Sequence, residues 1–408
     1  MGSELTGSPG RGGNDSDRAG HPATPPPRHL TTPRRVAVIG AGIIGAAVAH
    51  RLAEKNAAVI LLDRADSGHG ATAASYAWVN ANRKVPRAYF DLSVAAMEEY
   101  RRLAWRLAPA PWYHVDGNLI WFDAPARSAA LWENVQRLQE WGYAAEMLPA
   151  GVVLTDLEPG LAIPDAETPV GWFPGEGWVD APAMTRRLVE GVRNAGGRVL
   201  IGPEREVIAI GTEGARVASI TLRGGQTIPV DALVNAAGPD ASRIAAMVGR
   251  PLPMAPRPGL AVRAEMADGS DALRRPVETD NIAVRPDGPG RVFLALPFDA
   301  EVELTDLPGG PIALDAPLVS QVLAWGADAV PALAAAQPIE ALVRVRPIPA
   351  DGLPSVGEVP NISGYYEAVT HSGVTLAPLI ARSLTDEILE QPVNPLLEPF
   401  RPERLVSP

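Results

Sequence analysis

The chain of 408 residues contains no cysteine. This absence excludes a disulfide scaffold, a thiolate nucleophile, zinc or iron–sulfur centres with cysteine ligands, and a cofactor tethered through a cysteine thioether. Lysine is almost absent too: of the 36 basic residues only Lys55 and Lys84 are lysine. Nearly every positive charge is therefore a guanidinium, and a reaction that requires a lysine amine is possible at only two positions.

The overall balance of residues narrows the class of protein further. A formal net charge of −11 argues against nucleic acid as a partner, because a phosphate backbone requires a basic surface. Hydrophobic residues make up 46% of the chain and charged residues 20%, which excludes a wholly disordered or fibrous protein. The length is sufficient for two domains or one large one.

The N-terminal region has no hydrophobic period. Residues 1–33 are rich in Gly, Ser, Thr and Pro with charges that cancel, which predicts a disordered tail. Arg34-Arg35 and the apolar residues 36–49 are similar to a twin-arginine export signal, but glycines interrupt them and no small-residue cleavage site follows. The apolar stretch is also too short to span a bilayer. We therefore expect a cytoplasmic protein without a membrane span.

A βαβ unit is predicted directly after this tail. Residues 36–39 form a buried-strand run, the glycine turn Gly40-Ala41-Gly42-Ile43-Ile44-Gly45 follows, and a helix continues to about Lys55. A second strand covers residues 58–62 and ends at Asp63. A strand, a glycine turn, a helix, a strand and an acid in this order form the dinucleotide-binding fingerprint.

Each part of the fingerprint has a physical role. Gly40 allows the tight turn, Gly42 lets a pyrophosphate approach the backbone, and Gly45 lets the helix pack on the strand. The N-terminus of the helix offers free N–H groups to phosphates. Asp63 can accept the ribose hydroxyls and would repel a 2′-phosphate, which disfavours NADP. The unit leaves both FAD and NAD open.

Four later segments carry a resemblance to a known family. Residues 70–75 read GATAAS, residues 234–239 read VNAAGP, residues 344–354 read RVRPIPADGLP and are completed by Gly357, and residues 370–378 read THSGVTLAP. In this order they resemble the motifs of the D-amino acid oxidase (DAO) family of FAD-dependent oxidoreductases, which includes glycine oxidase, sarcosine oxidase and D-amino acid dehydrogenase.

The resemblance implies an α/β fold in which a Rossmann-type FAD-binding domain is interleaved with an antiparallel-sheet substrate domain. We expect residues 34–108, 151–250 and 341–395 in the first domain and residues 109–150 and 251–340 in the second. The sequence supports this division independently, because short strands punctuated by proline and glycine follow residue 251, among them residues 260–264, 281–285 and 291–296.

The resemblance also implies a reaction. Members of the family oxidise the C–N bond of an amine or amino acid by hydride transfer to flavin N5, which yields an imine. The partners are then a small-molecule amine or amino acid and oxygen or another electron acceptor. A biosynthetic tailoring flavoenzyme and a non-catalytic flavin-binding partner subunit stay open as alternatives. The family-like segments 344–354 and 370–378 argue against an NAD-dependent dehydrogenase.

The resemblance further implies which residues bind a non-covalent FAD, since no cysteine is present to tether it. These are Gly40, Gly42, Ile44, Gly45, Asp63, Arg64, Thr72, Ser75, Val207, Ala237, Gly238, Gly373, Val374, Thr375 and Leu376. No metal is expected, because hydride transfer to a flavin requires none.

Arg346 and His371 are the candidate catalytic residues. Arg346 matches the arginine that grips the substrate carboxylate in amino-acid-oxidising members, and a planar guanidinium suits a bidentate carboxylate contact. Its alternative is a structural arginine bonded to backbone carbonyls. His371 matches a histidine common in the family, and we favour a capping or flavin-packing role over proton transfer.

The chain also departs from the family. Asn56 replaces the glycine that often ends the first helix, although asparagine tolerates the left-handed cap. No tyrosine lies between Tyr143 and Tyr365, where D-amino acid oxidase supplies one over its substrate. The sarcosine oxidase branch uses a lysine beside the flavin for oxygen, but both lysines here precede residue 85, so we expect none in that role.

Several aromatic and histidine residues lie near these motifs. Residues 70–75 resemble the family's pyrophosphate loop. Tyr76, Trp78 and Asn80 follow it and could line a pocket, but alternate aromatics also suit an ordinary strand face, which we favour. The remaining candidates are assigned to the fold: Tyr113, His114, Trp121 and His50.

Overall fold

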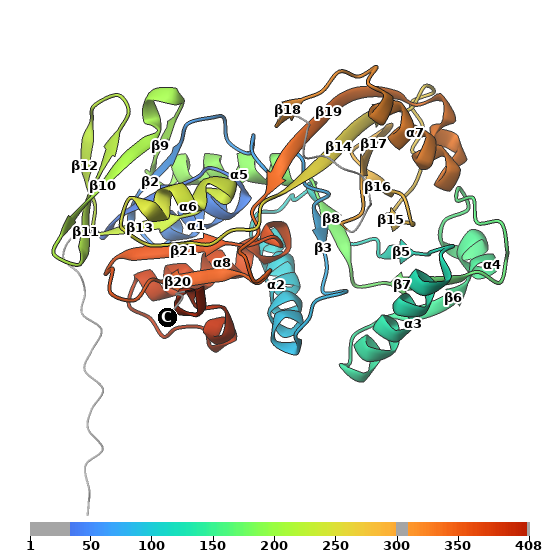
Figure 1. Ribbon diagram of the computed structural model, residues 1–408, viewed down its shortest axis with the longest axis horizontal. Coiled ribbons are helices and arrows are strands. Elements are labelled where there is room, and N and C mark those ends of the chain that lie inside the picture. The colour runs from blue at the N-terminus through green and yellow to red at the C-terminus, as the bar shows by residue number, and fades with distance from the viewer. Residues whose placement is uncertain (1–32, 299–308, 406–408) are drawn as a thin grey trace, which may run out of the picture. The chain divides into compact units, whose positions relative to one another are not determined.

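The computed structural model describes residues 33–298 and 309–405, and this part of the chain contains two large sheets (Figure 1). The tail predicted for residues 1–33 lies outside the described residues apart from Pro33. In the described residues no helix is long and apolar enough to cross a membrane.

The first sheet contains six strands in the order β20-β21-β13-β1-β2-β9. Their bounds are β1 (Arg35–Ile39), β2 (Ala58–Asp63), β9 (Arg198–Ile201), β13 (Ala232–Asn235), β20 (Ser355–Glu358) and β21 (Tyr365–Val369). All neighbours are parallel except β20 and β21. Helix α1 (Ile43–Glu54) connects β1 to β2, so the predicted βαβ unit is confirmed. Asn56, just after α1, has a φ of 62°, as the left-handed cap requires.

Alternate residues of β1 enter different cores, which explains its continuous apolar sequence. Val36 and Val38 pack in a core with α1, α2 (Arg87–Arg106), α5 (Ala181–Asn194) and α8 (Gly373–Ile388). Ala37 and Ile39 pack in a second core. Other contributors to this core include β10 (Val207–Glu213), β11 (Arg216–Leu222), β12 (Thr227–Pro229) and α6 (Ala241–Ala246). A hairpin with Gly224-Gly225 in its turn joins β11 to β12.

The second sheet contains nine strands in the order β18-β19-β14-β17-β16-β15-β5-β7-β6. Their bounds are β5 (Asn118–Ile120), β6 (Glu146–Pro149), β7 (Pro169–Phe173), β14 (Arg257–Glu265), β15 (Val277–Glu278), β16 (Ala283–Pro286), β17 (Arg291–Ala295), β18 (Gly310–Pro311) and β19 (Gln337–Arg346). Every pair is antiparallel except β15 with β5. An α/β fold with a mainly parallel sheet and a mainly antiparallel sheet is therefore confirmed.

Short elements complete the described chain. A three-stranded sheet contains β3 (Trp78–Val79), β8 (Gly177–Val179) and β4 (Tyr113–His114). The remaining α-helices are α3 (Pro125–Glu140), α4 (Ala150–Val152) and α7 (Pro317–Ala329). The 3₁₀ helices cover Pro203–Arg205, Gly238–Asp240, Pro331–Ala335, Pro395–Phe400 and Pro402–Leu405, and a π-helical turn covers Val153–Leu157.

The pairing of strands crosses two of the expected domain boundaries, and the division into domains stays a prediction. Strand β7 lies within the residues 151–250 assigned to the first domain, yet it pairs with β5 and β6 in the nine-stranded sheet. A boundary at residue 341 would divide β19, which pairs with β14 from Gln337 to Arg346. The physical reason is that long-range hydrogen-bond partners decide where a strand belongs, and a local hydrophobic pattern does not reveal them.

Candidate functional site

The turn between β1 and α1 requires glycine at two positions. Gly40 has a φ of +104°, and a Cβ there would lie 2.2 Å from the carbonyl oxygen of Ala236. A Cβ on Gly45 would lie 1.8 Å from the carbonyl oxygen of Gly40. Both obstacles are backbone atoms that cannot move aside. The close approach of β1, β13 and α1 at this turn therefore leaves no room for a side chain.

The first turn of α1 presents backbone N–H groups at the same place. The N–H of Ala46 makes the first helical hydrogen bond, to Gly42 O at 2.9 Å, so the N–H groups before it have no acceptor within the helix. Ile43 N donates to Thr72 Oγ1 at 3.1 Å, and Ile44 and Gly45 belong to the same turn. Free N–H groups and the positive end of the helix dipole fit a phosphate.

Asp63 ends β2 beside this turn and is half-buried. Its Oδ2 accepts from Ala41 N at 2.7 Å and its Oδ1 accepts from Ala65 N at 3.0 Å. A carboxylate has about four acceptor sites, so two remain for a ligand's hydroxyl groups. A pocket surrounds the carboxylate; its lining is Ile39, Gly40, Leu62, Asp63, Arg64, Arg205, Glu206, Val207, Ala237, Asp240 and Arg243. This pocket and the glycine turn together fit a dinucleotide.

Charged side chains surround one side of the pocket. Arg64 is exposed and pairs with Asp240 at 2.5 Å and with Glu206 at 3.5 Å. Glu206 also pairs with Arg243 at 3.2 Å and with Arg223, and the hydrogen bond from Arg223 lowers the pKa of Glu206. Arg64 thus lies at the predicted pocket, but its guanidinium already has two carboxylate partners.

The two predicted loops beside the pocket have different structural roles. Thr72 is buried and contacts the first turn of α1, whereas Ser75 Oγ accepts from Ala77 N at 3.0 Å and holds its own loop. After β13, Asn235 Oδ1 accepts from Ala237 N at 3.3 Å, and Gly238 has a φ of +58°. Ala237 and Val207 line the pocket, so the structure brings these predicted residues together.

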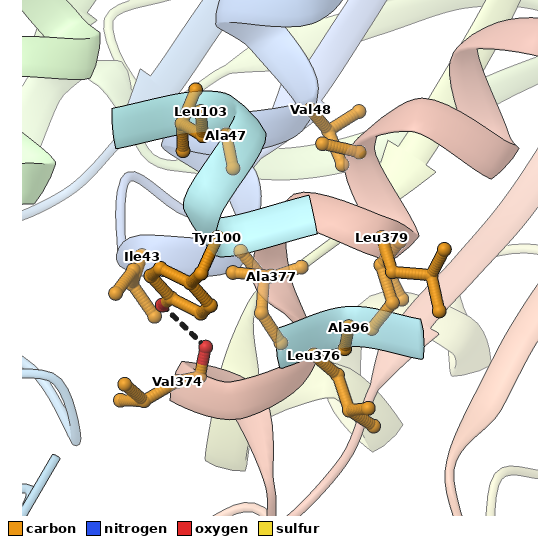
Figure 2. Packing of buried hydrophobic residues seen from close by; sticks show 14 of the residues in the cluster. Ile43, Ala47, Val48, Ala96, Tyr100, Leu103, Val374, Leu376, Ala377 and Leu379 are labelled. Carbon is orange, nitrogen blue, oxygen red and sulfur yellow. Dashed lines mark hydrogen bonds between the residues drawn. The ribbon is translucent and has the colours of Figure 1, made fainter. Parts of the chain in front are cut away.

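The first turn of α8 lies against the first turn of α1. A Cβ on Gly373 would lie 3.1 Å from Ile44 Cδ1, and Leu376 N makes the first helical hydrogen bond, to Ser372 O at 3.0 Å. Tyr100 OH from α2 donates to Val374 O at 2.6 Å, and Figure 2 shows this bond among the packed side chains of Ile43 and Ala377. Two helix N-termini therefore converge, and each presents N–H groups without an acceptor in its own helix.

Arg346 lies at the end of β19, where its side chain crosses Gly259 of β14. A Cβ on Gly259 would lie 2.8 Å from Arg346 Nε, so glycine makes room for the guanidinium. Arg346 packs over the ring of Phe298 at 5.3 Å. Burial and the neighbouring Arg257 lower its pKa. Within residues 33–298 and 309–405, Arg346 has no carboxylate within ion-pair distance.

His371 contacts the same aromatic ring. Its ring centroid lies 5.0 Å from that of Phe298 in an edge-on arrangement. Burial, together with the charges of Lys84 and Arg346, lowers the pKa of His371, so the imidazole is neutral at pH 7. Its side chain makes no cap on α8, where Ser372 is the N-cap residue. We refer to Arg346, Phe298 and His371 as the arginine–histidine cluster.

The aromatic residues after the pyrophosphate loop have structural contacts. Tyr76 OH donates to the carbonyl oxygens of Val277 and Val284 in the nine-stranded sheet. Trp78 belongs to β3, and Asn80 N donates to Thr375 Oγ1 at 3.3 Å. Among the others assigned to the fold, the ring of His114 stacks on Trp178 at 4.0 Å. Trp78 thus lies in a strand, whereas Tyr76 and Asn80 lie outside β3, so the strand is shorter than the alternating pattern predicts.

Two residues near the cluster were not identified from the sequence. Lys84 lies close enough to His371 for its charge to lower the pKa of the imidazole, although it precedes that residue by most of the chain. The fold brings residues 77–84 against α8, which places Lys84 there, and the expectation that no lysine serves oxygen beside the flavin stays a prediction. Glu176 is fully buried near Lys84. The rarity of lysine in the sequence was a signal for Lys84, but no motif marked Glu176.

The model of the DAO family, described as FAD dependent oxidoreductase, matches residues 35–387. Glycine oxidase of Geobacillus kaustophilus (strain HTA426) is 27% identical over 389 residues, which cover 90% of this chain and 95% of the relative. Glycine oxidase of Pseudomonas aeruginosa is 26% identical over 381 residues, with 90% and 97% covered. The crystal structure of glycine oxidase from Geobacillus kaustophilus has a TM-score of 0.78 at 24% identity and covers 92% of this chain and 100% of that chain.

Proposed function

The chain belongs to the DAO family of FAD-dependent oxidoreductases, and on this premise we propose that its substrate is an amine that carries a carboxylate group. The protein is an enzyme that uses FAD to oxidise the C–N bond of amines or amino acids. The relatives named glycine oxidase act on an amino acid, which supports a substrate of this class.

Arg346 carries the proposal. Its partly buried guanidinium has an aromatic ring beside it and no carboxylate within ion-pair distance among the described side chains. A cation that is withdrawn from water and lacks a partner is costly until an anion arrives. A guanidinium binds a carboxylate through two parallel N–H···O bonds, so Arg346 would fix both the position and the orientation of the substrate.

The proposed binding of FAD is non-covalent, because no cysteine is available for a thioether link. The residues that would hold the pyrophosphate are Gly42, Ile44, Gly45 and Thr72, at the N-terminus of α1. Asp63 would accept from the ribose, and Val207 and Ala237 would line the pocket beside it. When it is bound, FAD supplies the two-electron acceptor for the oxidation.

The first turn of α8 is the proposed partner of the flavin ring. The N–H groups of Gly373, Val374 and Thr375 precede the first helical hydrogen bond, and the positive end of a helix stabilises negative charge. We assign His371 a packing role against Phe298, since a neutral imidazole with a lowered pKa is a weak base at pH 7. An electron acceptor, either oxygen or another carrier, completes the cycle.

The test is anaerobic reduction of the purified protein by a panel of amines. D-amino acids, glycine derivatives and secondary amines are compared with matched amines that lack the carboxylate. The expected result is a yellow protein that a carboxylate-bearing amine bleaches at far lower concentration than its neutral match. Equal bleaching by both members of each pair removes the role of Arg346, and a colourless protein that binds NAD contradicts the assignment of FAD.

A further inference from the structure

Residues 77–84 connect the first turn of α8 to the nine-stranded sheet. Thr375 Oγ1 donates to Trp78 O at 3.0 Å and accepts from Asn80 N at 3.3 Å. At the far end of the segment, Arg83 pairs with Glu278 of β15 at 2.5 Å. Ala77 and Arg83 have φ angles of 56° and 57°, a left-handed conformation that is rare for residues other than glycine. The segment is therefore held near both ends, and Lys84 is its last residue.

Lys84 is directed toward the turn that carries His371. Its half-buried Nζ lies 5.7 Å from the ring centroid of Tyr89. The hydroxyl of Tyr89 lies 2.6 Å from Ser372 Oγ, next to His371. The ammonium group is thus placed near the arginine–histidine cluster, which is the proposed site of the substrate.

Glu176 is the buried carboxylate whose charge acts on Lys84. It is 0% exposed, and its Oε1 accepts from Asn82 N at 3.0 Å, from Tyr143 OH at 2.9 Å and from Ala81 N at 3.3 Å. Its Oε2 has no hydrogen-bond partner in the described part of the chain. A fully buried carboxylate with one oxygen unpartnered needs either a proton or a nearby cation.

Burial moves the pKa values of both groups toward pH 7. It lowers the pKa of Lys84 to about 8, with help from the charge of Arg83, and it raises the pKa of Glu176 to about 7. Their mutual attraction opposes both shifts. The other titratable groups around the pair are Arg83 from the same segment, Tyr89 from α2, Tyr143 from the segment after α3, and His371 from the turn before α8.

We propose that Lys84 accepts the proton that the substrate ammonium group must lose before oxidation, and that Glu176 is the residue that positions and balances the resulting charge. This inference rests on the proposed function. In the step, one N–H bond of the substrate ammonium breaks and one N–H bond forms at Nζ of Lys84. The substrate becomes a neutral amine, and Lys84 becomes an ammonium group beside the Glu176 carboxylate; no electrons are exchanged.

Lys84 suits this role better than His371. A proton acceptor works best when its pKa lies near the operating pH, and the pKa of Lys84 is lowered toward that range, whereas the pKa of His371 is moved below it. Arg346 cannot serve, because a guanidinium keeps its protons in proteins.

A direct titration of the two lysines is the first test. Reductive methylation with ¹³C-formaldehyde labels Lys55, Lys84 and the N-terminal amine of the holoenzyme, and the Lys84→Met variant assigns the signals. The exposed Lys55 is the internal control. Lys84 is expected to titrate near pH 8 rather than near the ordinary 10.5, and its midpoint should fall further in Glu176→Gln. A Lys84 midpoint near 10.5 overturns the proposal.

The second test is the pH dependence of anaerobic flavin reduction. With Lys84 as the acceptor, the rate should rise by about fifty-fold between pH 6 and pH 8, as the neutral fraction of a group with a pKa of about 8 does. In Lys84→Met the inflection should move up to the amine's own pKa, and Lys84→Arg should not restore it, because arginine keeps the charge without accepting a proton.

The outcomes separate the two proposals. If amines reduce the flavin and the inflection near pH 8 persists in both Lys84 variants, Lys84 is not the acceptor and the proposed function stands. If no amine reduces the flavin in any variant, the proposed function is wrong, and this inference is wrong too because it rests on that function.

Discussion

The glycine turn between β1 and α1 and the arginine–histidine cluster are built in opposite ways. At the glycine turn, contiguous backbone defines the site, and Gly40 and Gly45 are required because other backbone atoms occupy the space of a Cβ. The cluster instead gathers side chains from β19, from the segment that follows β17 and from the turn before α8. A substitution that disturbs the backbone of the glycine turn should abolish folding and FAD binding together. A substitution in the cluster should remove only the contact that the replaced side chain makes.

The largest effect is expected for Gly45→Ala. Its Cβ would lie 1.8 Å from Gly40 O, so the strand and helix must separate, at a cost of more than about 4 kcal/mol in the free energy of unfolding. Soluble yield, thermal unfolding and bound flavin measure the loss. Gly70→Ala is the matched control, because nothing lies within 4 Å of its Cβ position. If both variants lose the same stability, crowding of the backbone does not define the turn.

Glu176→Gln tests the buried carboxyl near the cluster. Since burial raises the pKa of Glu176 from 4.5 to about 7, the folded protein binds a proton between these values that the unfolded chain does not. Stability of the wild type should therefore fall as pH rises from 4.5 through 7, by roughly 3 kcal/mol.

The glutamine variant should lack that part of the pH dependence, because an amide does not titrate. It should still fold, because its oxygen can accept from Asn82 N and Tyr143 OH. Urea unfolding of both proteins at pH 5 and pH 8 measures the difference. Glu140→Gln, on the exposed end of α3, is the control. A wild type and a Glu176→Gln variant with parallel pH profiles would contradict the raised pKa.

Arg346→Ala should weaken the binding of the substrate without changing the binding of FAD. Loss of the guanidinium should raise KM for a carboxylate-bearing amine about a hundredfold, corresponding to two charge-assisted hydrogen bonds. The effect on a neutral amine should be small. Arg344→Ala is the control on the same strand, where the side chain instead contacts His69. Steady-state kinetics with paired substrates decide, and an equal rise for neutral and acidic amines removes the carboxylate role.

The smallest effect is expected for Asp63→Asn. The amide can keep the hydrogen bond from Ala41 N but turns an NH₂ group toward Ala65 N, where the carboxylate now accepts. We expect the FAD dissociation constant to rise about tenfold, measured by flavin fluorescence. The neighbouring exposed Asp66→Asn serves as the control. An unchanged constant in Asp63→Asn would show that this carboxylate makes no contact with the ribose.

The same contrast explains what the sequence could predict. The βαβ unit and the cap at Asn56 depend on local geometry, and glycine spacing and capping preference record that geometry directly. The partners of β7 could not be read in this way, because the alternating pattern of a strand does not say which strands it joins. Lys84 illustrates the same limit, since its place beside His371 depends on how residues 77–84 cross to α8.

Glu176 shows a second kind of limit. It stands in the loop before β8 without any motif, and its raised pKa comes from complete burial and from donors on the segment of Ala81 and Asn82. Arg346 could be predicted from the sequence, because residues 344–354 around it resemble a motif of the family. What could not be predicted was its surroundings, including Gly259 beneath its guanidinium.

The division of labour between the two regions is the central claim, and one pair of variants tests it directly. The dissociation constants of FAD and of a carboxylate-bearing amine are measured for Asp63→Asn and Arg346→Ala. Binding of the amine is followed by the change that it causes in the flavin spectrum. The account predicts that Asp63→Asn weakens FAD alone and that Arg346→Ala weakens the amine alone. Equal weakening of both ligands in both variants would contradict it.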